Sequence, residues 1–122
     1  MSLVEQRAEG IHVVRFVSAD RIAVDDVEFR QSFLLLPEQS FPDHWPDGVA
    51  SLTIAHLDRV LERQPELILL GSGMRQHFPA PAILGHVLSK RVGLEVMDNG
   101  AAARTYNLLA AEGRRVATLF LF

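Results

Sequence analysis

The first third of the chain shows the alternation of apolar and polar positions that is typical of β-strands. Residues 11–17 are rich in β-branched and aromatic side chains, which pleated strands favour. Between residues 22 and 29, apolar side chains alternate with others on either side of Asp25 and Asp26, and this pattern predicts a short hairpin. A fuller apolar run at 32–36 predicts a further strand.

A proline-rich segment, residues 37–50, interrupts the strand pattern. Pro37, Pro42 and Pro46 lack the backbone donors that a helix or a central strand needs. We therefore expect an ordered loop whose aromatic side chains pack against the body of the protein. Trp45 fits the role of a packed structural residue better than the alternative role of a partner-binding surface.

Beyond residue 50, helical and strand patterns alternate. Apolar residues recur at helical spacing in three segments, and nearly continuous apolar runs lie between them. The predicted helices cover 54–61, 83–88 and 102–110, and the predicted strands cover 67–70, 94–97 and 116–122. Ser51 or Thr53 is suited to cap the first helix, and Gly113 is suited to end the third.

This order of elements predicts one α/β domain that spans residues 1–122. Strands that follow one another through helices need crossover connections, which favour parallel pairing and place helices over the sheet. We expect three layers: a mixed, mostly parallel central sheet of about five strands, with helices on both faces. The β-rich N-terminal part would supply edge or antiparallel strands.

Composition excludes several classes of function. The chain has 122 residues, of which 48% are hydrophobic and 22% charged, a balance typical of a folded globular domain. It has no cysteine, which excludes disulfides, thiolate nucleophiles and Cys-ligated zinc. The formal net charge of -3, without a dense basic stripe, argues against nucleic acid as a partner.

The expected location follows from two absent signals. The amino terminus has no basic stretch followed by an apolar one, so we expect no secretory signal. The apolar runs at 67–70 and 116–122 are far shorter than the ~20 residues of a membrane-spanning helix. These features predict a soluble, cytoplasmic protein without a membrane span, and they leave its oligomeric state open.

A glycine-containing loop, residues 71–79, follows the predicted strand at 67–70. Ligands of parallel sheets tend to bind at such loops, and Gly71 and Gly73 would let the backbone approach a ligand closely. The dinucleotide fingerprint, however, needs a third glycine that opens a helix, and Gln76 stands in its place. A tight turn at the strand exit is therefore a better interpretation than a nucleotide site.

No catalytic constellation is visible. Ser72 lies between two glycines, but a nucleophile elbow needs glycines at the positions that Leu70 and Met74 occupy. The five histidines show no metal-ligand spacing, and no paired carboxylates suggest acid–base chemistry. We expect no catalytic residue, no metal and no cofactor.

The start of the third predicted helix is the other candidate site, on the same edge of the sheet. Asn99 is suited to cap this helix, which would direct the amides from Gly100 onward outward as an anion site. Arg104 would add positive charge, and Asn107 lies on the same helix face. Alternatively, Asp98 pairs with Arg104 and holds the helix to the loop. The two interpretations are compatible, and the sequence favours neither.

Several of these segments resemble a known family. The resemblance rests on residues 67–73, Gln76, Pro79 and, above all, the sequence VMDNGAAARTYN at 96–107, which includes Tyr106. With these residues, the chain resembles the small-domain family that includes mitochondrial complex I assembly factor 3. The resemblance spans nearly the whole chain. The family usually has Thr where this chain has Ser72. It often has Thr or Ser in place of Asn99, and often Cys in place of Ala103. A cysteine-based role is therefore excluded here.

The resemblance implies a three-layer α/β fold and, for the eukaryotic members, assembly of respiratory complex I through protein contacts. The leading hypothesis is a non-catalytic interaction protein whose partners are complex I subunits or other assembly proteins. The alternative is a small-molecule binder, or an enzyme of unknown substrate, that holds an anionic ligand in a crevice between residues 71–79 and 98–107. The candidate contact residues are Gly71, Ser72, Gly73, Gln76, Asp98, Asn99, Gly100, Arg104, Tyr106 and Asn107.

Overall fold

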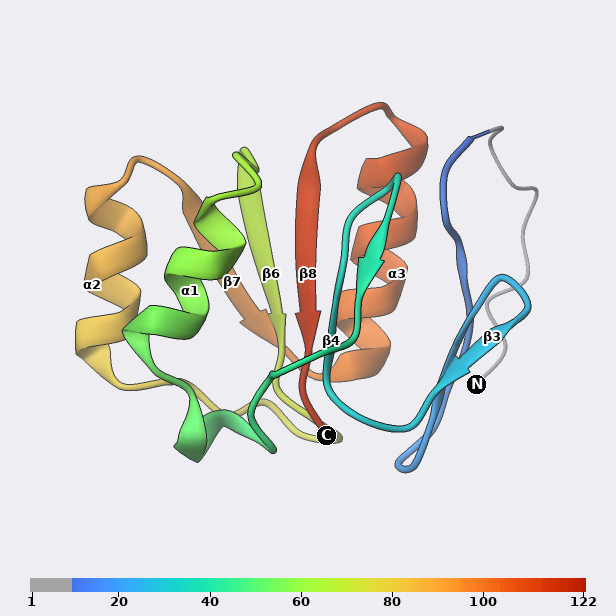
Figure 1. Cartoon of the computed structure of the whole chain (residues 1–122), viewed down its shortest axis with the longest axis horizontal. Coiled ribbons are helices and arrows are strands. Elements are labelled where there is room, and N and C mark those ends of the chain that lie inside the picture. The colour runs from blue at the N-terminus through green and yellow to red at the C-terminus, as the bar shows by residue number, and fades with distance from the viewer. Residues whose placement is uncertain (1–9) are drawn as a thin grey trace.

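The computed structural model describes residues 10–122, and its strands form two separate sheets (Figure 1). The small sheet is antiparallel and consists, in order, of β1 (Val14–Val17), β2 (Ile22–Val24) and β3 (Val27–Phe29). The large sheet has the order β5-β4-β8-β6-β7, with β4 (Phe33–Leu35), β5 (Ser40–Phe41), β6 (Leu67–Gly71), β7 (Gly93–Met97) and β8 (Val116–Phe120). The expectation of no secretory signal concerned the first seven residues, which lie outside the described part.

The large sheet is mixed, as predicted, but its parallel part is smaller than expected. β6 pairs in parallel with β7 and β8, whereas β4 pairs antiparallel with β8 and β5. Only β6, β7 and β8, which α2 (Pro81–Ser89) and α3 (Asn99–Ala111) connect, are parallel, whereas the short turn between β4 and β5 can join only antiparallel neighbours.

The β-rich N-terminal part follows the prediction only in part. It was expected to supply edge or antiparallel strands: β4 pairs antiparallel in the large sheet as predicted, whereas β1, β2 and β3 pair with one another in a separate sheet. A two-residue turn at Asp25 and Asp26 joins β2 to β3, and Asp25 takes a left-handed backbone conformation with φ 52°. Such tight hairpins pair locally, so this segment forms a sheet of its own.

Helices cover both faces of the large sheet (Figure 1). The short turn η1 (Val49–Ser51) leads into α1 (Ile54–Leu61), which lies beside α2 (Pro81–Ser89) on one face; α3 (Asn99–Ala111) and the small sheet cover the other. Side chains alternate between the faces of a strand, so Ile68 and Leu70 pack toward α1 and α2, and Leu69 packs toward α3. Two apolar cores therefore sandwich the sheet.

Side-chain contacts confirm two predictions, one about the cap of α1 and one about Trp45 in the segment before it. Thr53 caps α1, because its hydroxyl accepts from the His56 N–H at 3.4 Å while His56 Nδ1 accepts from the Thr53 N–H at 3.0 Å. Trp45 packs as predicted: its indole N–H donates to Phe41 O at 2.8 Å, and the Arg59 guanidinium lies 3.8 Å from the ring centre.

Candidate functional site

The carboxyl ends of β6, β7 and β8 lie at one edge of the large sheet, the lower edge in Figure 1. The two candidate segments start at this edge, as predicted, and backbone hydrogen bonds join them. The Ser72 N–H donates to Met97 O at 2.9 Å, and the Asn99 N–H donates to Gly73 O at 2.8 Å. The segments therefore contact each other directly where a crevice was expected.

Asn99 is at the centre of this contact, but it does not cap α3 as predicted. Its side chain is buried, with Oδ1 accepting from the Gly73 N–H at 3.2 Å and Nδ2 donating to Leu121 O at 2.9 Å. The cap is Asp98, whose carboxylate accepts from the Ala101 N–H at 2.9 Å. Asp and Asn are equally good cap residues, so only the burial of Asn99 distinguishes them.

The position of Asp98 changes the electrostatics expected at the start of α3. A carboxylate already occupies the positive end of the helix dipole, which disfavours a second anion there. This carboxylate accepts a hydrogen bond from the Ala101 N–H, and its pairing with Arg104 stays a prediction. Arg104 is exposed on α3, and Gly100 is half-buried in its first turn.

Gly71 allows β6, β8 and α3 to approach one another. A Cβ atom at this position would lie 2.4 Å from Asn99 Oδ1 and 3.2 Å from Phe120 Cδ1. Gly73 has φ 107°, a conformation that favours glycine, and it forms the turn that leaves the sheet. We call Gly71, Ser72, Gly73 and Asn99 the strand junction.

Ser72 and Gln76 hold the loop that follows the strand junction. The buried Ser72 hydroxyl donates to Arg75 O at 2.7 Å and accepts from the His77 N–H at 3.0 Å. The Gln76 side chain donates to Val96 O on β7 at 2.9 Å. These contacts give both side chains a structural function, while their predicted contact with a ligand or partner stays a prediction.

Tyr106 and Asn107 bind a different part of the molecule. The buried Tyr106 hydroxyl donates to His12 O at 2.8 Å. The Asn107 amide pairs with the backbone of β1, accepting from the Val14 N–H and donating to Val14 O, both at 2.9 Å. The structure therefore assigns these two predicted site residues to the contact between α3 and the small sheet.

A groove of about 590 Å³ opens on the other side of the loop after β6, between this loop and the segment before α1. Its lining consists of Asp47, Gly48, Val49, Ala50, Leu52, Ser72, His77, Phe78, Pro79, Ala80 and Phe122. Of the predicted site residues, only Ser72 lines it. Residues from 98–107 do not, so this groove is displaced from the expected crevice.

Two large apolar side chains in residues 74–78, the exposed loop, project from the same region. Met74 is 61% exposed and Phe78 is 63% exposed, and Phe78 also lines the groove. Sequence reasoning included the segment 71–79 in the candidate site but singled out neither residue. The available signal was their position between glycines and prolines, where no helical or strand period exists to bury them.

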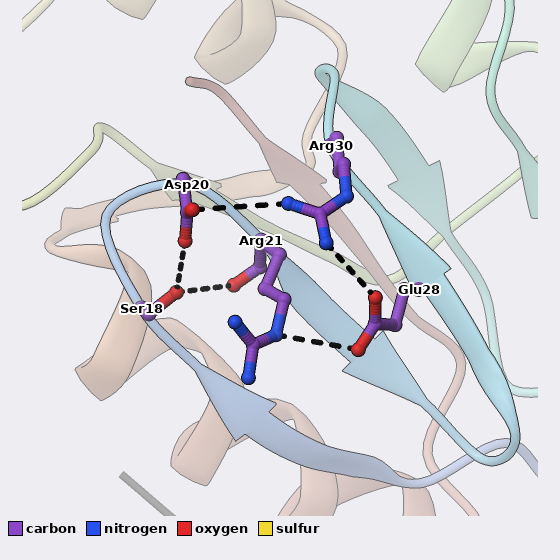
Figure 2. Close-up of polar contacts among 5 residues, drawn as sticks. All are labelled: Ser18, Asp20, Arg21, Glu28 and Arg30. Atoms are coloured by element: carbon purple, nitrogen blue, oxygen red, sulfur yellow. Dashed lines mark hydrogen bonds and ion pairs between the residues drawn. The ribbon is translucent and has the colours of Figure 1, made fainter.

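A charged cluster on the small sheet lies outside this site (Figure 2). Glu28 contacts Arg21 and Arg30 at 3.3 Å each, and Arg30 lies 3.7 Å from Asp20. A hydrogen bond from the Ser18 hydroxyl, at 2.8 Å, lowers the pKa of Asp20, and the two arginines act in the same direction. The charges in this cluster neutralise one another, which is typical of a solvated sheet face.

Together, the fold and this edge define the class of protein, which is a small α/β domain with a mixed sheet. Hydrogen bonds join the segments that follow β6 and β7, and an open groove lies beside them. Residues 10–122 contain no cluster of three side chains suited to hold a metal ion. None of the described helices is long and apolar enough to cross a membrane. The chain belongs to the family described as protein of unknown function (DUF498/DUF598), which matches residues 14–121.

Solved structures of similar proteins share this fold. A Bordetella parapertussis protein is 35% identical, with a TM-score of 0.85 over 94% of this chain and 98% of its own. A Xanthomonas campestris protein is 41% identical, with a TM-score of 0.82 over 99% of this chain and 92% of its own. These similarities establish the fold across bacterial relatives.

A curated relative adds a name but no activity. The Francisella tularensis protein called "13 kDa major membrane protein" is 33% identical over 75 residues. This match covers 62% of the present chain and 61% of the relative's length. Neither the family description nor these names mention complex I, so that part of the expectation stays a prediction.

Proposed function

We propose that this chain is a non-catalytic interaction protein that binds a protein partner through the groove and the exposed loop. The carrying observation is the exposure of Phe78, at 63%, on a groove with apolar walls, together with that of Met74, at 61%, in the same loop. Exposed apolar side chains that gather in one region are typical of protein-binding surfaces, because their burial in a complex is favourable.

The composition of the groove suits a partner side chain better than a flat contact. Val49, Leu52, Pro79 and Phe122 supply apolar walls, and polar groups such as His77 lie among them. A buried apolar centre with polar groups near its rim is the usual anatomy of a protein interface. An aliphatic or aromatic anchor of the partner would fill the groove while Phe78 packs against its flank.

The partner in this proposal is a subunit of respiratory complex I or another of its assembly proteins. The sequence resemblance at 96–107 supports this choice. The Francisella relative is called a membrane protein, which is compatible with a partner located at a membrane. The chain would then act by contact, holding or presenting its partner during assembly.

Native mass spectrometry of the tagged protein from its own host tests this proposal. We expect a retained respiratory subunit or assembly protein that is lost in Phe78→Ser. Leu108→Ser is the matched control, because Leu108 is 60% exposed on α3 and does not line the groove. Equal retention by both variants would contradict the proposed surface, and unchanged complex I level and activity after gene deletion would contradict the assembly role.

A second candidate is a small-molecule site in the same groove. Its volume of about 590 Å³ lies within the ~300–1,000 Å³ of typical ligand pockets, and Asp47, Ser72 and His77 supply polar groups. A thermal-shift screen with nucleotides, phosphates and carboxylates should then give a stabilising ligand whose effect is weaker in His77→Ala. No stabilisation by any compound would leave only the protein partner.

A further inference from the structure

β7 lies at an open edge of the large sheet. It pairs with β6 on one side only, and within the described chain no strand covers its other side. An uncovered edge presents backbone donors and acceptors that favour pairing with another strand.

Alternate residues of a strand direct their backbone groups to opposite edges, so the contacts of β7 identify the open positions. Met97 O accepts from the Ser72 N–H, which places the groups of Gly93, Glu95 and Met97 toward β6. Leu94 and Val96 therefore face outward. Val96 O already accepts from the Gln76 side chain, so Leu94 is the open centre of the edge.

The two faces of this edge differ in character. Val92, Leu94 and Val96 lie on the face of α1 and α2, where they pack with that core, and Leu88 on α2 is 63% exposed. Glu95 points to the opposite face and is exposed. A strand added here would meet apolar side chains on one face and a carboxylate on the other.

The charges along β7 favour a second copy of the same strand. Lys90 and Arg91 precede the strand, whereas Glu95 and Asp98 lie at its far end. An antiparallel copy would place the basic end of each strand against the acidic end of the other. Within residues 10–122, Lys90, Arg91 and Glu95 take part in none of the ion pairs, so their charges are available.

Like charges decide the register. Pairing centred on Glu95 would oppose two carboxylates, which is destabilising. Pairing centred on Leu94 opposes Leu94 to its own copy and Glu95 to Gly93, so the two carboxylates are no longer directly opposite. Arg91 lies in the turn before the strand, with φ 62°, at the end that faces Glu95 of the other copy, so its long side chain can approach that carboxylate.

We propose that two copies of this chain pair their β7 strands antiparallel about a two-fold axis at Leu94, so that the two large sheets become one. This surface is separate from the groove and the exposed loop, and the inference does not depend on the proposed function. The Leu88 side chains beside the axis would cover the new apolar contact.

Sedimentation equilibrium together with amide hydrogen exchange by NMR tests the pairing. From low-micromolar to submillimolar concentration, we expect a dimer to form and the Leu94 and Val96 amides to exchange more slowly. The Glu95 amide, which faces β6, should be slow throughout. A monomer over the whole range would overturn the proposal, as would a dimer whose Leu94 and Val96 amides keep their monomer rates.

A charge exchange tests the register. Arg91→Glu and Glu95→Arg should each weaken the dimer about two- to tenfold, because the pair occurs twice in the interface, and the double variant should restore it. Glu112→Arg, at the exposed end of α3, is the control and should leave the dissociation constant unchanged. Failure of the double variant to recover would overturn the Leu94-centred register.

Discussion

Three of the four strand-junction residues and the whole exposed loop belong to one nine-residue segment, residues 71–79, yet the side chains of the two regions have opposite surroundings. In the strand junction, Ser72 and Asn99 are about 95% buried, and their polar atoms are hydrogen-bonded. In the exposed loop, Met74 and Phe78 direct large apolar groups into solvent. The most distinctive sequence motif therefore maintains the structure, and less distinctive neighbours are available for binding.

This contrast follows from the cost of burial. A buried polar group without a partner is costly, so residues at the strand junction must match one another closely. An exposed apolar side chain costs the folded monomer little, and it gains when a partner covers it. Substitutions in the two regions should therefore separate stability from binding.

The largest effect is expected from Gly71→Val. The added side chain would displace Asn99 Oδ1 and press on Phe120, combining overpacking with lost hydrogen bonds, at a cost of at least about 3 kcal/mol. Urea denaturation followed by circular dichroism measures it. Gly85→Ala is the control, because nothing lies within 4 Å of that position on α2, and it should stabilise by about 0.5–1 kcal/mol. A small effect at Gly71 would show that the strand junction tolerates a side chain.

Asn99→Ala should reduce stability by about 2–3 kcal/mol. It leaves the Gly73 N–H and Leu121 O without their side-chain partner in a buried place. The free energy of unfolding in urea is the measurement. If the loss were below about 0.5 kcal/mol, the hydrogen bonds of Asn99 would be replaceable and the strand junction would not depend on them.

Asn107→Ala should cost about 1–2 kcal/mol and act locally. It removes two hydrogen bonds to Val14, so the small sheet should loosen from α3 while the large sheet keeps its protection. Hydrogen exchange of residues 14–29, compared with 67–71, measures the difference. Uniform acceleration across both sheets would show that they unfold as one unit.

Phe78→Ser should change stability by less than about 0.5 kcal/mol, since its side chain is largely exposed. If Phe78→Ser loses the partner but keeps its melting temperature, Phe78 acts in binding, in contrast to Asn99, whose substitution by Ala lowers stability. A clearly lower melting temperature would show instead that Phe78 supports the fold. Thermal melting and partner retention should be measured on the same preparation.

A small effect that depends on pH is expected from the exposed cap of α1. Burial, and to a lesser degree the Arg59 guanidinium, lowers the pKa of His56 below 6.5. The folded state therefore binds this proton more weakly than the unfolded chain, and stability should fall as the pH drops below 6.5. His56→Gln should remove this dependence at a cost below about 1 kcal/mol at neutral pH. Thermal melts at pH 5.5 and 7.5 measure it, and an unchanged pH dependence in the variant would contradict this role.

Much of the architecture was predictable from particular residues. The apolar spacing of Leu57 and Val60 predicts α1, and the continuous run 67–70 predicts a strand covered on both faces. The strand-exit turn at Gly71 and Gly73 was also predicted. The cap of α3 was wrong by one residue, because Asp98 and Asn99 have nearly equal local preferences and differ only in their tertiary surroundings.

The sequence by itself determined the helices, the parallel strands and the shared edge at which the candidate segments lie. These depend on periodicity, which each segment carries locally. Only the tertiary structure decided that the N-terminal strands form their own sheet, that Asn99 joins three elements, and that Phe78 is exposed beside a groove. Those outcomes depend on contacts between residues far apart in the chain, such as Gly73 and Asn99, which no local pattern encodes.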